Sequence, residues 1–176
     1  MSNHSLKATG SPRLRLMFGG RMNRTRHLLI VCAYVALLAG ICGPWMYLGF
    51  ASAADGPMRG YLAYFIMLAM AIHGIITLDT FGPALVALVV GVLPALTILP
   101  SRFYANSQSV RLWTFVAMVS VAGLVGRIDL ALIPGNSHGM YWGFMADVVA
   151  HALFLLTAML ALMDCRKLIA EQKNGL

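Results

Sequence analysis

Residues 27–50 form an apolar stretch with the sequence HLLIVCAYVALLAGICGPWMYLGF. It contains no Asp, Glu, Lys or Arg, and at about 1.5 Å per helical residue it is long enough to cross a hydrocarbon core of about 30 Å. Trp45 and Tyr47 stand near its far end, where amphipathic rings favour the membrane interface. The stretch therefore predicts a transmembrane helix.

Four further apolar runs follow along the chain. They occupy about residues 60–78, 83–99, 111–133 and 141–163. Gly91 and Pro94 interrupt the run over 83–99 and predict a kink there. The sequence thus predicts an all-α fold, a polytopic membrane helical bundle of five transmembrane helices over residues 27–164. Residues 1–26 are expected to form a disordered basic tail, and residues 165–176 a short charged one.

The composition favours lipid as the surroundings of the chain. Of the 176 residues, 60% are hydrophobic and 11% are charged, whereas a soluble domain carries about a quarter of charged residues. Six of the thirteen Lys and Arg residues precede His27, which suits the anionic cytoplasmic leaflet. Nucleic acid is not an expected partner, because this segment predicts no folded basic face. Cys32, Cys42 and Cys165 show no CxxC spacing, so neither a disulfide framework nor a cysteine metal site is predicted.

The basic segment also predicts the orientation, with the N-terminus in the cytoplasm and the chain in the cell inner membrane. Five alternating spans then leave the C-terminus outside. They also leave six basic residues on the outer side, namely Arg59, Arg102, Arg111, Arg166, Lys167 and Lys173, so the two sides are nearly tied. Two alternatives stay open: residues 83–99 are re-entrant, which returns the C-terminus to the cytoplasm, or Ala51-Ser52-Ala53 is a signal-peptide cleavage site.

Ionisable residues inside the expected spans are the candidates for function, because they are costly in lipid and normally face the bundle interior. They are His73, Arg127, Asp129, Asp147 and His151. Counted from the midpoint of each span, all five fall in the same half of the bilayer. The sequence therefore predicts one buried polar layer, in which Arg127 pairs with Asp147 or Asp129.

Two kinds of bound group are compatible with these residues. His73 and His151 supply the two imidazoles of a b-type haem site. Asp147 and His151 are four positions apart on one helix face, so together they are candidates for a metal ion. Met67 and Met70 near His73 are candidates for a Cu(I) site, although methionine is also ordinary core filler. No nucleotide-binding or hydrolase motif is present.

Three functions follow as hypotheses, and no stretch is specific enough to indicate a family. The first is a non-catalytic subunit or an assembly or accessory factor of a membrane complex, whose polar residues hold helices together. The second is a b-type haem electron-transfer or quinone-interacting subunit. The third is a small oligomeric proton or metal transporter. In each case the expected partners are the lipid bilayer and other membrane subunits.

Overall fold

The computed structural model describes residues 12–46, 57–77, 82, 85, 87–105, 107–132 and 141–174. The helices are α1 (Pro12–Cys42), α2 (Gly60–Thr77), the π-helix η2 (Ala87–Val92), α4 (Leu93–Ile98), α5 (Ser101–Tyr104), α6 (Val110–Leu132) and α7 (Trp142–Asn174). Two short strands, β1 (Pro44–Met46) and β2 (Met58–Arg59), pair antiparallel. The predicted all-α class is confirmed.

Among the residues that the structure describes, four helices are long and apolar enough to cross a membrane, and the count of five is not confirmed. The four qualifying segments are Arg24–Cys42, Gly60–Thr77, Val110–Asp129 and Trp142–Glu171. The third expected span is a shorter apolar segment, Ala87–Ile98. It starts as a π-helix and changes to an α-helix just before Pro94, which lacks the N–H of a regular helical residue.

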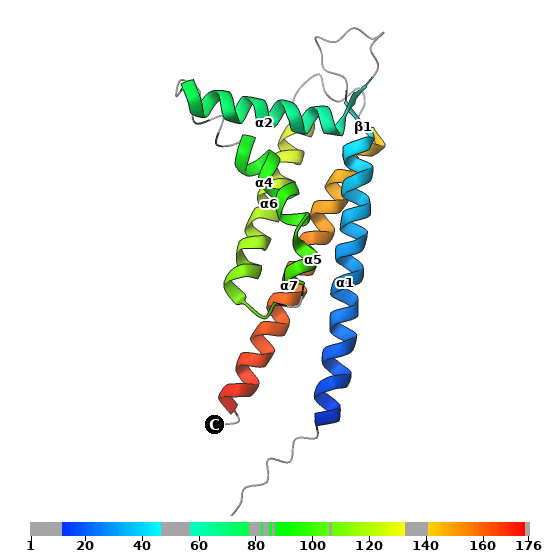
Figure 1. The fold of residues 1–176 in the computed structure, drawn as a ribbon, viewed down its shortest axis with the longest axis vertical. Coiled ribbons are helices and arrows are strands. Elements are labelled where there is room, and N and C mark those ends of the chain that lie inside the picture. The colour runs from blue at the N-terminus through cyan, green and yellow to red at the C-terminus, as the bar shows by residue number, and fades with distance from the viewer. Residues whose placement is uncertain are drawn as a thin grey trace, which may run out of the picture.

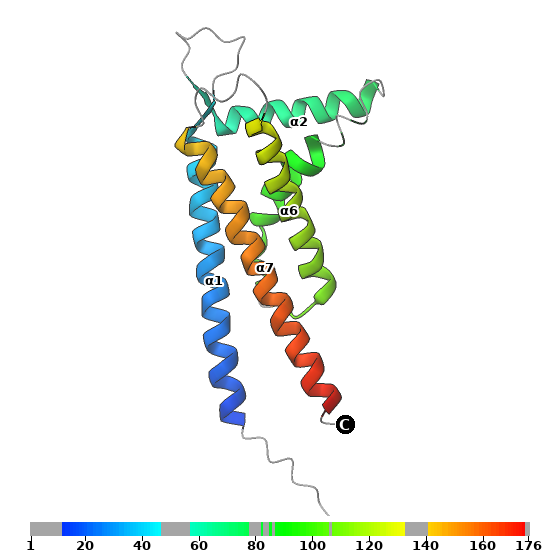
Figure 2. The ribbon, with the colours of Figure 1, turned by 180° about the vertical axis from the view of Figure 1, so that it is seen from behind.

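The helices do not form a simple parallel bundle. Helix α7 lies between α1 and α6, and α1 and α7 run antiparallel, so the first residues of α1 and the C-terminus lie at the same end (Figures 1 and 2). Helix α2 lies crosswise over the opposite end (Figure 1). From beneath α2, the segment η2–α4–α5 runs back towards the end that holds the termini. The expectation of termini at opposite ends is therefore not met.

Helices α1 and α7 approach closely because glycines line their contact. A Cβ added at Gly40 would lie 2.8 Å from Cβ of Asp147, and one added at Gly143 would lie 2.6 Å from the carbonyl carbon of Gly43. Small residues at such positions let two backbones pack directly, which is a common device in membrane helices. Below this crossing the contact widens into the main apolar core. Its members include Ala33, Leu37, Ala150, Phe154, Ala158 and Ala161.

Helix α1 ends earlier than the apolar run of residues 27–50. Gly43 and Pro44 follow Cys42, and proline cannot continue the hydrogen-bond ladder of a helix. The chain turns into β1, and Trp45 is fully buried, with its indole Nε1 donating to the carbonyl oxygen of Gly40 at 2.8 Å. Trp45 thus packs inside the protein, while Tyr47 lies outside the described residues.

Residues 12–26 are expected to be disordered, but helix α1 begins at Pro12. Helix α7 continues to Asn174, through most of the charged C-terminal segment. Arg26 Nε lies 3.8 Å from Asp164 Oδ2, which links the first half of α1 to the last third of α7. Residues 1–11 and the Ala51-Ser52-Ala53 sequence lie outside the described residues.

Candidate functional site

The centre of the candidate site is a buried ion pair between α6 and α7. Nε of Arg127 donates to Oδ2 of Asp147 at 2.8 Å, and the two side chains are 3% and 0% exposed. Of the two predicted partners of Arg127, the structure selects Asp147. The cost of removing two charges from water is offset here by their proximity and by further hydrogen bonds.

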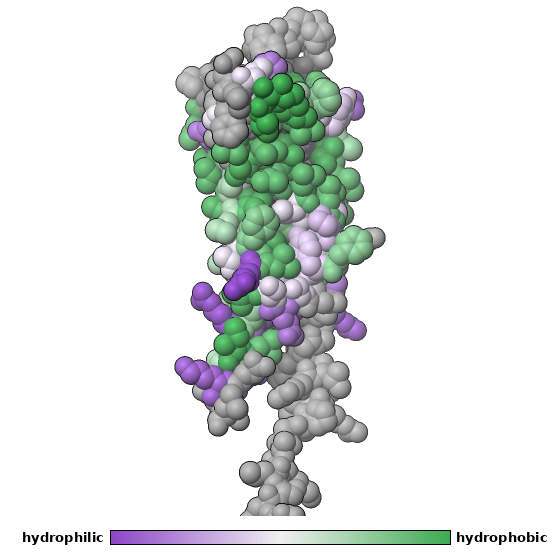
Figure 3. All heavy atoms as spheres, turned by 60° about the vertical axis from the view of Figure 1, so that its left-hand side comes forward, coloured by the Kyte–Doolittle hydropathy of each residue, from purple (hydrophilic) through white to green (hydrophobic). Residues whose placement is uncertain are grey.

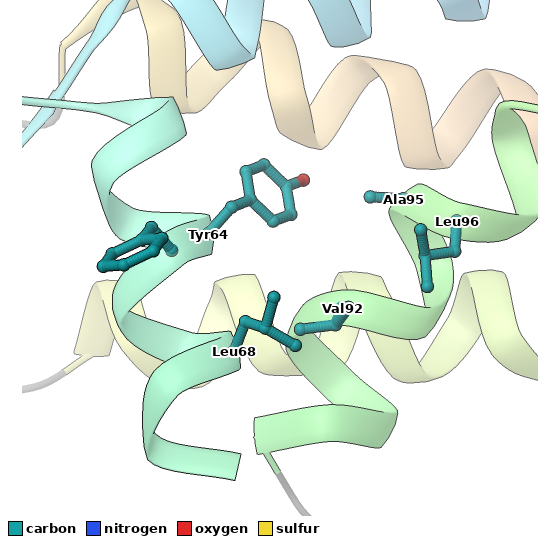
Figure 4. A pocket seen from close by; sticks show the side chains of 6 residues that line it. Tyr64, Leu68, Val92, Ala95 and Leu96 are labelled. Carbon is teal, nitrogen blue, oxygen red and sulfur yellow. The ribbon is translucent and has the colours of Figure 1, made fainter. Parts of the chain in front are cut away.

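Tyr64 of α2 closes the network. Its hydroxyl donates to Oδ1 of Asp147 at 2.5 Å and accepts from Nη2 of Arg127 at 2.8 Å. The same Nη2 lies 3.4 Å from the carbonyl oxygen of Gly91 in η2. Figure 4 shows the ring of Tyr64 extending from α2, with its hydroxyl on the side of Ala95 and away from Leu68. One small set of polar atoms thus joins α2, η2, α6 and α7.

Aromatic rings surround the guanidinium group of Arg127. Its Cζ lies 5.8 Å from the ring centroid of Trp45 and 5.6 Å from that of Tyr64. Trp45 contacts Tyr64 and Phe144 edge to face, at centroid separations of 5.4 and 5.7 Å. The negative faces of such rings attract a cation, and their bulk excludes water. The rings therefore strengthen every hydrogen bond within the network.

His151 lies one helical turn beyond Asp147 and is fully buried. Its Nδ1 is 2.8 Å from the carbonyl oxygen of Asp147, which assigns the proton to Nδ1 and leaves Nε2 as an acceptor. Nε2 has no hydrogen-bond partner among the residues that the structure describes. A Cβ added at Gly123 would lie 2.5 Å from Cδ2 of His151 and 2.8 Å from Cβ of Pro94. The imidazole is therefore tightly enclosed between α6 and α4.

Two of the predicted residues lie outside the buried layer. His73 is exposed on α2, and its carbonyl oxygen accepts from the hydroxyl of Thr77 at 3.0 Å. Asp129 is also exposed, because two residues along a helix turn it about 200° away from Arg127. The predicted layer of five residues is thus reduced to Arg127, Asp147 and His151, and Tyr64 is added to it.

This geometry gives little support to the predicted haem and metal sites. Both carboxylate oxygens of Asp147 accept hydrogen bonds, so a metal ion would compete with Tyr64 and Arg127 for them. Within the described part of the chain, no group of three or more His, Cys, Asp or Glu residues could hold a metal ion. His73 is exposed and His151 is enclosed. Met70 is exposed, whereas a Cβ added at Gly91 would lie 2.6 Å from Sδ of Met67, so this sulfur packs against η2.

A cavity of about 240 Å³ adjoins the polar network on the side of α2. It is lined by Tyr64, Phe65, Leu68, Val92, Ala95 and Leu96 (Figure 4). Neither His73 nor His151 is among these residues. The lining is apolar, and the hydroxyl of Tyr64 takes part in two hydrogen bonds of the polar network.

Comparison with other proteins adds no relative. The chain matches no known protein family, and no curated protein or solved structure is detectably similar to it. The chain is thus a small all-α protein whose described part has four helices suited to cross a membrane, and a buried Arg–Asp–Tyr network joins several of its helices.

Proposed function

We propose that this chain is a multi-pass protein of the cell inner membrane that serves as a non-catalytic subunit or an assembly or accessory factor of a membrane complex. One observation carries the proposal: the buried side chains of Arg127 and Asp147 form an ion pair with one another, and both hydrogen-bond to the hydroxyl of Tyr64. Catalytic or transport sites need a charge that is available to a substrate. Here the charges instead tie helices together.

Insertion into a membrane is supported by the surface of the helices. Large apolar side chains are exposed on all of the long helices, among them Val31, Val35, Phe65, Ile76, Met118, Val125 and Met159. Figure 3 shows apolar residues covering the upper part of one face, with hydrophilic residues gathered towards the lower end. Contiguous apolar surface of this extent is not tolerated in water, whereas lipid accepts it.

The arrangement also supports a specific topology, with both ends of the chain in the cytoplasm. Because α2 lies crosswise, η2–α4–α5, α6 and α7 return the C-terminus to the side of the N-terminus (Figure 1). The six basic residues that precede His27 then share that side with five others, namely Arg102, Arg111, Arg166, Lys167 and Lys173. Arg59 on β2 lies at the opposite end. The numbers of Lys and Arg residues on the two sides, nearly equal with five spans, thus change to a clear excess on the cytoplasmic side, as the positive-inside rule requires.

Reporter fusions test this topology. A fluorescent reporter that matures only in the cytoplasm, fused after Leu176, is expected to be active, and a periplasmic phosphatase at the same position is expected to be inactive. The reverse pattern would place the C-terminus outside and restore five spans. A phosphatase inserted between Pro57 and Met58, next to β2, serves as the matched control and is expected to be active.

Native electrophoresis of mildly solubilised membranes tests the role as a subunit. We expect the chain to migrate with a complex much larger than its own 19.0 kDa. His73→Ala and His151→Ala are expected to leave the activity of that complex intact. Loss of activity at an unchanged protein level would show that a histidine takes part in the chemistry, and would contradict a non-catalytic role.

The unpartnered Nε2 of His151 is the observation that favours the second candidate, a b-type haem subunit. His73 and His151 would be the ligands of this group. An absorption spectrum of the purified protein decides the matter. A Soret band that shifts on reduction with dithionite would support haem, and a spectrum without it would remove this candidate.

The third candidate, an oligomeric proton or metal transporter, would use Asp147 and His151. Its requirement is a pathway to these side chains, both of which are fully buried. A protein that remains strictly monomeric in detergent would argue against it.

A further inference from the structure

A second groove lies between α1 and the α4–α5 segment, away from the polar network. Its volume is about 450 Å³, and it is lined by His27, Ile30, Val31, Tyr34, Val35, Leu99 and Phe103. On α1 the lining extends from His27 to Val35, which is about 12 Å along the helix axis. The groove therefore runs along the middle of α1. Its His27 side faces the end of the molecule at which α1 begins and α7 ends, called here the basic end.

The two ends of this groove differ in chemistry. Towards the middle of the molecule its walls are the aliphatic side chains of Val31, Val35 and Leu99. Towards the basic end they include His27 and the exposed ring of Phe103, which is 77% exposed. Arg24 is exposed and precedes His27 by three positions, so it continues the same face of α1.

The charge at the basic end is strongly unbalanced. Six basic residues lie towards this end: Arg24 and Arg26 in the first half of α1, Arg111 in the first turn of α6, and Arg166, Lys167 and Lys173 in the last part of α7. Asp164 and Glu171 are the acidic residues of the same part of α7, and Asp164 lies beside Arg26. An apolar groove that opens onto an excess of positive charge matches the two parts of an anionic lipid.

We propose that this groove holds an acyl chain of an anionic phospholipid, whose phosphate lies at Arg24 and His27. The inference rests on the proposed insertion into a membrane, and not on the role as a subunit. The aliphatic walls of the groove suit the acyl chain, and the basic residues beside its His27 end suit the phosphate.

Native mass spectrometry of the purified full chain tests the proposal. The protein is mixed with micelles that contain equal amounts of phosphatidylglycerol and phosphatidylcholine, and the lipid that stays bound is identified. We expect one phosphatidylglycerol to be retained preferentially. Val31→Trp fills the groove and is expected to reduce that retention at least fivefold. Val149→Trp, on the exposed side of α7, is the matched control and is expected to change nothing.

A charge variant tests the position of the phosphate without altering the groove. Arg24→Gln is expected to lower the preference for phosphatidylglycerol over phosphatidylcholine about fivefold, as the loss of one basic residue near a membrane surface implies. Lys173→Gln, which removes the same charge from the end of α7, is expected to have a much smaller effect.

Three results would overturn the proposal. The first is equal retention of both lipids, and the second is unchanged retention in Val31→Trp. The third is a dimer that dissociates in Val31→Trp, which would show that a second copy of the chain occupies the groove. All are measured on the isolated protein, so failure of the subunit role does not affect them. Extraction of the chain from membranes by alkaline carbonate would instead contradict membrane insertion itself.

Discussion

The hydroxyl of Tyr64 donates a 2.5 Å hydrogen bond to Oδ1 of Asp147, across 83 positions of the sequence. This bond joins the crosswise helix α2 to α7. Helix α2 has no other buried polar side chain in the network, so Tyr64 is its polar attachment to the interior among the described residues. The orientation of α2 thus depends on this hydroxyl group, on the short β1–β2 pair and on the apolar packing of Ala63 and Met67.

Replacing Tyr64 by Phe tests this dependence. The variant keeps the ring but leaves Oδ1 of Asp147 without its donor, so we expect a loss of about 1–3 kcal/mol in the free energy of unfolding. Unfolding in detergent, followed by circular dichroism, measures it. Tyr61→Phe removes an exposed hydroxyl from the same helix and is expected to be neutral. Equal effects of the two variants would show that the network does not hold α2.

The buried pair of Arg127 and Asp147 predicts a pattern of non-additive stabilities. Arg127→Met or Asp147→Leu alone leaves a buried charge without its partner, and each is expected to cost about 3–5 kcal/mol. The double variant removes both charges and is expected to recover most of that loss. Asp129→Asn, at an exposed carboxylate nearby, is the control. Additive losses in the double variant would contradict the pairing.

Hydropathy predicted the helices well but not their directions. The runs at 111–133 and 141–163 correspond closely to α6 and to the first part of α7. The run at 60–78 became α2, whose direction could not be predicted, because an apolar helix satisfies its backbone at any angle to its neighbours. That direction depends in part on the bond of Tyr64 to Asp147 and on the pairing of β1 with β2, which are long-range contacts without a sequence pattern.

The site was predicted in part. Arg127 and Asp147 stood out because charges in an apolar run are costly. Tyr64 did not, because tyrosine is common in membrane helices and a hydroxyl group there is not unusual. Asp129 could have been excluded from its spacing, since residues two positions apart on a helix face different directions. The spacing of Arg127 and Gly123, one turn apart, was the available sign of the inward face of α6.

The glycine contact between α1 and α7 predicts that adding one methyl group there lowers the stability of the protein. Gly40→Ala would place Cβ 2.8–3.0 Å from side-chain and backbone atoms of Asp147, and we expect a loss of about 1–3 kcal/mol from overpacking. Gly82→Ala adds the same group where nothing lies within 4 Å and is expected to be neutral or slightly stabilising. Thermal unfolding of both variants in one detergent compares them directly.

The crosswise position of α2 predicts the depths of two of its side chains. Phe65 and Ile76 are exposed and eleven residues apart, which is about 16 Å along a helix. Spin labels on Phe65→Cys and Ile76→Cys, with the three native cysteines replaced, are expected to report nearly the same depth from oxygen and nickel accessibility. A difference near 16 Å would mean that α2 crosses the membrane instead.

The enclosed imidazole of His151 predicts an unusually mild substitution. His151→Leu removes the unpaired Nε2 together with the bond from Nδ1 to a helical carbonyl group, so these effects oppose each other. We expect the free energy of unfolding to change by less than about 1 kcal/mol. A loss of several kcal/mol would reveal a partner of Nε2. His73→Leu, at an exposed position, provides the baseline for the comparison.

The antiparallel contact between α1 and α7 has a consequence for how the protein is made. Helix α1 leaves the ribosome well before its partner α7, because about 100 residues separate Cys42 from Trp142. At about 5–20 residues per second, α1 waits roughly 5–20 s for its partner. During that interval its glycine-lined face must be covered by lipid or by an insertion chaperone. A nascent chain arrested before Trp142 is therefore the natural substrate for membrane quality control.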